Sequence, residues 1–223
     1  FHALDDYTQK PIYTSLMRIL RYVAFLTAVL LPGFYVAIAN FHPELIPDAL
    51  LLNLAASIQI TPYNLMAECL IVHVFYEILR EAGLRMPTDL GHAVSIVGGI
   101  VIGDILVSAG LVGAPVILIV AVSSITSFIV PDLYNSIVIM RFSFILAGGI
   151  WGLFGITVAG LLYLYKICSM DAYGVPFTAP VSPFSLQAMR DTFIRTDWRI
   201  LSRKNPVPSD LNGVTAEERS SNG

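Results

Sequence analysis

Long apolar runs without a charged side chain are the feature that most limits how this chain can fold. Residues 22–40 and 142–165 contain no Lys, Arg, Asp or Glu. A helix needs roughly 20 apolar residues to cross a hydrocarbon layer about 30 Å thick, and both runs have that length. We therefore expect an all-α integral membrane fold, built as a multi-span helical bundle with amphipathic interfacial helices.

The composition agrees with a membrane location. The chain has 223 residues, of which 56% are hydrophobic and only 13% are charged, whereas about a quarter of a typical soluble domain is charged. The net charge of -3 gives no basic field for nucleic acid. The chain begins at Phe1 with a polar stretch that lacks the features of a signal peptide, so we expect a fragment whose N-terminal soluble part is missing.

The apolar and polar stretches divide the chain into four regions. We expect a cytoplasmic amphipathic segment at 1–21, a transmembrane domain at 22–168, a cytoplasmic interfacial segment at 169–205 and a disordered tail at 206–223. Within the second region lie five apolar segments, at 22–40, 62–84, 87–110, 116–130 and 136–168. Pro32-Gly33 should kink the first of these, and the shorter run 50–60 suggests an interfacial or re-entrant helix.

The distribution of Lys and Arg predicts the topology. These residues cluster before position 22 and after position 165, which places both ends in the cytoplasm and requires an even number of crossings. Four to five segments could span, so either 62–84 does not cross or 136–168 folds back at Gly148-Gly149. The charges in 62–84 favour the first solution and its Arg80/Arg85 pair favours the second; we favour the first.

The segment 62–84 should be a helix that starts near Pro62 and ends near Gly83. It carries three polar residues of interest, Glu68, His73 and Glu77. Their face could line an aqueous pore, in which acidic groups would favour cations. The helix could instead lie flat at the interface with its charges solvated, and this second interpretation is favoured.

Further pore or gating candidates lie in the later apolar segments: Asp104, Ser108, Ser123 and Ser127. A carboxylate inside the membrane costs about 2.5–3.5 kcal/mol on insertion scales, so Asp104 is either an ion or gating site, with Ser108 one turn on, or an interior hydrogen-bonded group. Hydroxyls such as those of Ser123 and Ser127 could line a pore, but in membrane helices they more commonly bond their own backbone carbonyls.

Small residues recur at helical spacing and suggest close helix packing. They are Ser95, Gly99, Gly103, Gly148 and Gly152. The contact could be between subunits or within one chain, and we favour packing within the chain. Cys69 and Cys168 should be buried small hydrophobes. We find no catalytic motif and no metal-ligand spacing, so the sequence predicts no enzyme, no metal and no cofactor.

Several ordered words carry a resemblance to a known family. They are EILREAGLRMP at 77–87, GHAVSIVGG at 91–99, FHPE at 41–44, SFIVP at 127–131, GVPFTAP at 174–180 and SPFSLQAMRDTFIR at 182–195. In these words the chain resembles the A subunits of GerA-type spore germination proteins, over roughly residues 5–203. The related SpoVAF proteins share the fold. Where the family commonly has Gln, this chain has Asp104.

The resemblance implies the membrane domain of a multi-pass protein of the spore inner membrane. A subunits of this family act with a transporter-like B subunit, which senses the germinant, and with a lipoprotein C subunit. They are expected to form a homo-oligomeric channel in the bilayer that releases cations at germination. The alternative is a non-conducting scaffold that couples the sensor to downstream germination proteins. A secondary transporter is less favoured, because the chain has no inverted repeat and too few spans.

Overall fold

The computed structural model describes residues 11–172 and 175–176. The chain divides into two compact units, residues 24–159 as one and residues 1–23 with 160–223 as the other. In the second unit the described residues form the outer ends of two long helices and a short antiparallel pair, β1 (Asp171–Ala172) and β2 (Val175–Pro176). The predicted segments at 185–201 and 206–223 lie outside the described residues.

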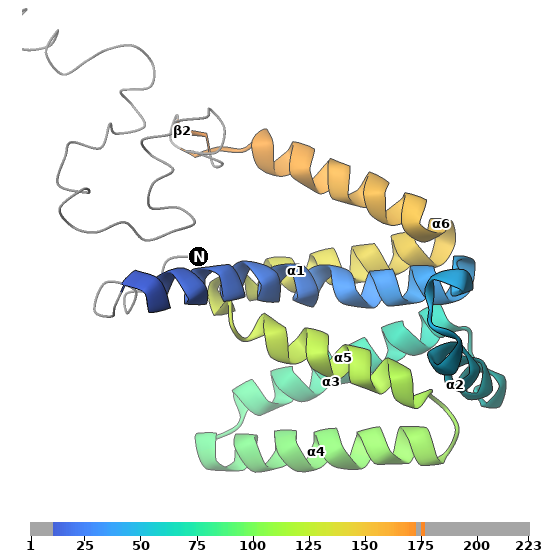
Figure 1. Ribbon diagram of the computed structural model, residues 1–223. Helices are drawn as coiled ribbons and strands as arrows, with labels where there is room; N and C mark the ends of the chain where they lie inside the picture. Colours follow the sequence, from blue (N-terminus) through green and yellow to red (C-terminus); the bar gives the residue numbers. More distant parts are fainter. Residues whose placement is uncertain (1–10, 173–174, 177–223) are drawn as a thin grey trace, which may run out of the picture. The chain divides into compact units, whose positions relative to one another are not determined.

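The described fold is almost entirely helical (Figure 1). The elements in chain order are α1 (Pro11–Phe41), η2 (Pro43–Leu45), α2 (Asp48–Ile60), α3 (Leu65–Arg85), α4 (Thr88–Ser108), α5 (Ala114–Ser127), η3 (Pro131–Leu133) and α6 (Tyr134–Cys168). This confirms the all-α fold. The expected run 50–60 forms most of α2.

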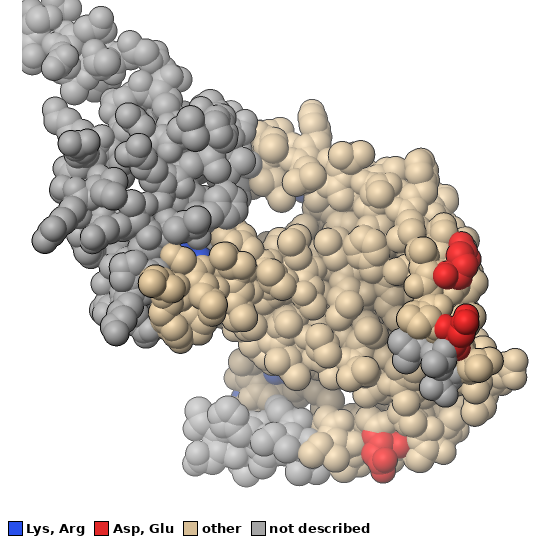
Figure 2. All heavy atoms as spheres, viewed as in Figure 1, with Lys and Arg blue, Asp and Glu red and all other residues tan. Residues whose placement is uncertain are grey.

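Two helical stretches are long and apolar enough to cross a membrane, Ile12–Phe41 and Pro131–Cys168. Shorter apolar helices occur at Gly98–Ser108 and Ala114–Ser127. Large apolar side chains are exposed on these helices, and in Figure 2 the described surface in view is almost entirely uncharged. Such a surface suits lipid or protein contact rather than water. Four to five spans remain a prediction.

The core of the 24–159 unit lies where α1, α3, α5 and α6 meet. Its buried side chains come from all four helices and from the connection before α5: Val36, Leu65, Cys69, Val72, Val112, Val116, Val120 and Ile145. Helix α3 packs against α4 and α5, and α2 packs against α5. Helices α1 and α6 approach closely at two glycines, since a Cβ on Gly148 would lie 2.6 Å from the Gly33 carbonyl oxygen.

Helix α1 is longer than expected. One continuous helix covers residues 11–21 of the predicted amphipathic segment and the whole first apolar run, with Pro32 inside it, and Figure 1 shows α1 without a sharp bend. A proline inside a helix removes the N–H that would bond the carbonyl four residues earlier. The Ala28 carbonyl is therefore left without its helical donor.

The boundaries of α3 correct the sequence-based prediction. The helix begins at Leu65, because the Asn64 side chain accepts a hydrogen bond from the Ala67 N–H at 2.8 Å and caps the helix. It does not end at Gly83 but continues to Arg85, where the extended backbone before Pro87 stops it.

Helix α6 reverses direction near its midpoint (Figure 1). Gly152 has φ 62° and ψ -145°, a conformation that is essentially confined to glycine. A Cβ on Gly155 would lie against the Ala147 carbonyl, although eight residues of straight helix span about 12 Å. The chain therefore folds back within 136–168, at Gly152 rather than at Gly148-Gly149, which agrees with the less favoured of the two solutions. Which segments cross a membrane stays a prediction.

The prediction for the two cysteines is half right. Cys69 is buried in the core and Cys168 is exposed. Cys168 is the last residue of α6. This position at the helix end explains why it is exposed although its neighbours in sequence are apolar.

Candidate functional site

A buried arginine lies at the centre of the 24–159 unit. Arg141, on α6, has no exposed surface. Its Nε donates a hydrogen bond to the Ala28 carbonyl oxygen at 3.0 Å, and its Nη2 donates to the Ser123 carbonyl oxygen at 3.1 Å. Because Pro32 deprives Ala28 of its helical donor, Arg141 satisfies an acceptor that would otherwise be buried unpaired. One side chain thus ties together α1, α5 and α6.

Glu77 connects α3 to this arginine. Its Oε1 lies 3.7 Å from Arg141 Nη1. The hydroxyl of Tyr134 donates to the same carboxylate, at 2.9 Å from Oε1 and 2.8 Å from Oε2. The guanidinium carbon of Arg80 lies 3.3 Å from the centre of the Tyr134 ring, which is a cation–π contact. We call Glu77, Arg80, Tyr134 and Arg141 the polar cluster.

His73 lies beside the polar cluster and is completely buried. Its Nδ1 is 2.8 Å from the Cys69 carbonyl oxygen, and because a carbonyl only accepts, Nδ1 carries the proton. Its Nε2 lies 3.4 Å from the hydroxyl of Ser123. The ring therefore links α3 to α5, whereas the pair of Glu77 and Arg141 links α3 to α6.

Glu68 lies on α3, five residues before His73 and apart from the polar cluster. It is 1% exposed, and its Oε2 accepts a hydrogen bond at 3.0 Å from the N–H of Gly113, immediately before α5. The amino end of a helix stabilises an anion by typically 0.3–1 kcal/mol. Glu68 thus anchors the start of α5 against α3.

These positions contradict the expectation that the polar side chains at 68, 73 and 77 of α3 are solvated, while the orientation of α3 relative to a membrane stays a prediction. Glu68 and His73 are inside the protein, and Glu77 is paired with Tyr134 and Arg141. The structure brings Glu77, His73 and Ser123 close together, while Glu68 stands apart at the other end of the same helix.

The serines of α5 use their hydroxyls locally. Ser123 Oγ donates to the Val120 carbonyl at 3.0 Å, and Ser127 Oγ donates to the Ser124 carbonyl. Both side chains are buried. This is the arrangement that the sequence favoured, in which the hydroxyls bond backbone carbonyls of their own helix.

Asp104 and Ser108 lie apart from the polar cluster. Both are exposed on α4, and Asp104 is only four residues from the end of the helix. The Ser108 hydroxyl donates to the Ile105 carbonyl at 3.3 Å. One of the two interpretations made Asp104 an interior hydrogen-bonded group. Its exposure in this chain contradicts that interpretation.

The small residues fall into two classes. Gly148 packs against α1 and Gly152 forms the reversal of α6. On α4, a Cβ on Gly99 would meet nothing within 4 Å, and one on Gly103 would reach only Ile117, at 4.0 Å. The side chain of Ser95 is outside the described part of the structure. Among the described residues Gly99 thus has no close partner and Gly103 has only Ile117, which differs from the preference for internal packing at these two positions.

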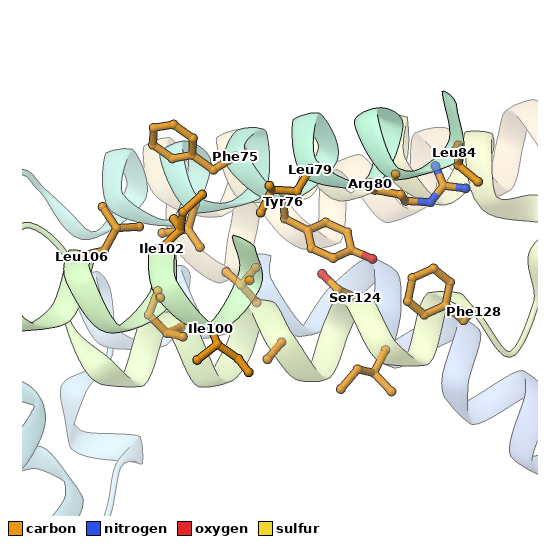
Figure 3. Close-up of a pocket in the computed structure, with 18 of the residues that line it drawn as sticks. Phe75, Tyr76, Leu79, Arg80, Leu84, Ile100, Ile102, Leu106, Ser124 and Phe128 are labelled. Atoms are coloured by element: carbon orange, nitrogen blue, oxygen red, sulfur yellow. The ribbon is translucent and has the colours of Figure 1, made fainter. Parts of the chain in front are cut away.

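A groove of about 960 Å³ runs between α3, α4 and α5. Its walls are mostly aliphatic and aromatic, with Val72, Leu79, Leu106, Ile117 and Phe128 among them, and Gly99 and Gly103 also line it. Figure 3 shows Arg80 near Leu84 and Phe128, while the hydroxyls of Tyr76 and Ser124 point toward one another. The groove adjoins the polar cluster, because Arg80 belongs to both.

Sequence reasoning did not identify the residues that organise this region. Arg141, Tyr134 and Arg80 were not singled out as site residues, although an arginine within an apolar segment is a signal that it has an interior partner. A second signal is Pro32, because a proline inside a helix leaves the carbonyl four residues earlier without its helical donor. Among the described residues no group of three His, Cys, Asp or Glu side chains is close enough to hold a metal ion.

Fold and site together define a class: an all-helical protein with helices long enough to cross a membrane and with paired polar side chains in its interior. Comparison with known proteins gives the family. The family model described as Bacillus/Clostridium GerA spore germination protein matches residues 1–207. The chain therefore belongs to the GerA spore germination protein family.

Individual relatives agree with the family match. Spore germination protein KA of Bacillus subtilis (strain 168) is 38% identical over 89% of this chain and 37% of its own length. Spore germination protein GerQA of Bacillus cereus is 39% identical over 92% of this chain and 41% of its own length. The uncharacterized membrane protein YfkQ of Bacillus subtilis (strain 168) is 35% identical over 97% of this chain and 43% of its own length. The chain thus spans about two fifths of these relatives. No solved structure matches it.

Proposed function

We propose that this chain is the membrane region of an A-type subunit of a spore germinant receptor and that several copies form a cation channel that opens at germination. Family membership supports the receptor assignment. We propose the spore inner membrane as its location, with a transporter-like B subunit and a lipoprotein C subunit as its partners.

The observation that carries the channel proposal is the exposed polar position on α4. Asp104 and Ser108 are exposed beside an apolar helical surface, where contact with lipid would be costly for a carboxylate. On the same helix, Gly99 and Gly103 lack a close internal partner. Copies that meet through α4 would shield Asp104 from lipid and could place it along a water path that favours cations.

The alternative is a non-conducting scaffold. The contacts of one residue of the polar cluster, Glu77, favour this alternative. Glu77 is held by Tyr134 and Arg141, so its charge stabilises contacts between helices and is not available to a passing ion. In a scaffold, this cluster would hold the bundle in the shape that a sensor subunit recognises.

Reconstitution of the complete receptor in liposomes tests the proposal. With germinant, we expect cation efflux that Asp104→Asn lowers while the complex stays assembled. A Ser136→Asn variant is a control, because Ser136 is exposed on α6 and is not a pore candidate. Absence of germinant-dependent efflux from the wild-type complex would end the channel proposal and leave the scaffold.

A further inference from the structure

We infer that the groove between α3, α4 and α5 binds one anionic phospholipid, with an acyl chain along its apolar walls and the phosphate at Arg80. The volume of about 960 Å³ and the walls formed by Val72, Leu79, Ile117 and other apolar side chains suit a hydrocarbon chain. The inference needs the groove to face lipid, but it does not need the chain to conduct ions.

The charge of Arg80 selects the headgroup. Arg80 is half-buried in the groove wall, and its guanidinium lies over the ring of Tyr134. Glu77, one turn earlier, is engaged by Tyr134 and Arg141, and no ion pair within 4 Å joins Arg80 to a described carboxylate. A guanidinium beside apolar surface is costly without an anion, and its planar fork matches a phosphate.

The position of Arg80 along α3 suits a headgroup at the membrane surface. It lies five residues before the end of the helix at Arg85, or about 7.5 Å along the axis. From Arg80 the groove extends to Val72, which is about 12 Å along the same axis. Basic pockets between membrane helices on the cytoplasmic side are known to bind anionic lipid headgroups.

Two other occupants are less suited to these walls. An unattached phosphate would satisfy Arg80 but would leave the apolar surface uncovered. A helix from a second copy would cover the apolar surface, and the small residues on α4 would admit it, but an apolar helix would leave Arg80 without a counter-charge. The lipid satisfies both features at once.

Photolabelling tests this inference. The full-length protein is placed in phosphatidylcholine vesicles that carry a minor fraction of phosphatidylglycerol with a photoreactive acyl chain. We expect peptides of α3, α4 and α5 to be labelled about tenfold more than with a matched photoreactive phosphatidylcholine, a ratio that equals about 1.4 kcal/mol of binding preference. Arg80→Gln should abolish the preference and Arg80→Lys should retain part of it.

Two matched controls separate the site from general effects. Arg85→Gln removes the same charge from an exposed ion pair with Glu81 and should leave labelling unchanged. Ala121→Phe fills the groove and should lower labelling, whereas Val122→Phe adds the same ring at an exposed neighbour that does not line the groove and should not. Monodisperse elution of every variant shows that folding is retained.

Three results would overturn the inference. Equal loss of labelling in Arg80→Gln and Arg85→Gln would mean general attraction to anionic lipid. Competition by soluble glycerol phosphate would mean a site for phosphate alone. Crosslinks from the groove into a second chain, in place of lipid adducts, would mean that a partner helix fills it. The measurement requires no ion efflux, so its failure is distinct from failure of the channel proposal.

Discussion

At the scale of single residues, Arg141 and Pro32 complement one another through the carbonyl of Ala28. Pro32 leaves the Ala28 carbonyl without a helical donor, and Arg141 supplies the missing hydrogen bond from another helix. Arg141 also balances Glu77 and bonds the carbonyl of Ser123. A charge that would be expensive in an apolar bundle is thus matched by acceptors from three helices.

Replacing Arg141 should destabilise the bundle strongly. Arg141→Gln leaves Glu77 without its buried cationic partner and weakens two hydrogen bonds to carbonyl oxygens. We expect a loss of about 3–5 kcal/mol, as for other broken buried pairs, measured by denaturation in detergent. Arg85→Gln, which breaks an exposed pair with Glu81, should cost about 0–1 kcal/mol. Similar losses for both variants would contradict this account.

A double-mutant cycle tests the link to Pro32. Pro32→Ala restores an N–H that can bond the Ala28 carbonyl within α1, so that carbonyl no longer needs Arg141. Arg141→Gln should then cost about 1–2 kcal/mol less in the Pro32→Ala background than in the wild type, the size of one hydrogen bond to a charged group. Strict additivity of the two changes would show that the hydrogen bond to Ala28 has no energetic weight.

The reversal of α6 is the decisive feature at the scale of elements. Gly152 adopts φ 62° and ψ -145°, and a Cβ there would also lie 3.0 Å from the ring of Phe41. Gly152→Ala should therefore cost about 1–3 kcal/mol from backbone strain, read from the thermal stability of the protein in detergent. Gly103→Ala, in regular helix with space for a methyl group, should be neutral or stabilising. Equal stability of both variants would argue against the reversal.

The elements show how far sequence could predict this fold. Helical periods and apolar lengths predicted the helices, because these signals are local. The reversal was only the less favoured alternative and was placed at Gly148-Gly149, since these glycines and Gly152 are alike in sequence. Only contacts with α1 and α3 distinguish them: Gly148 meets Gly33, and Gly149 meets Met66. The burial of Glu68 and His73 depended on Gly113 and Ser123, some fifty positions away, which no local pattern could reveal.

At the scale of the whole molecule, the feature that matters is the face of α4 that lines the groove. Gly99 lines the groove, and a Cβ there would meet no atom of the described residues within 4 Å, so the same face could receive a neighbouring subunit or a lipid. If copies meet through the small residues of α4, close backbone approach is what they require, and a large side chain at this position should prevent assembly without disturbing the fold of a single chain.

Gly99→Leu tests that requirement. Because a Cβ there would meet no atom within 4 Å, we expect the folded chain to retain its thermal stability, whereas the share of oligomer measured by crosslinking in native membranes should fall several-fold. Ala121→Phe fills the same groove from α5 and should leave the oligomer intact. Loss of assembly in both variants would mean that the groove itself is the subunit interface, and no loss in either would mean that copies meet through another face.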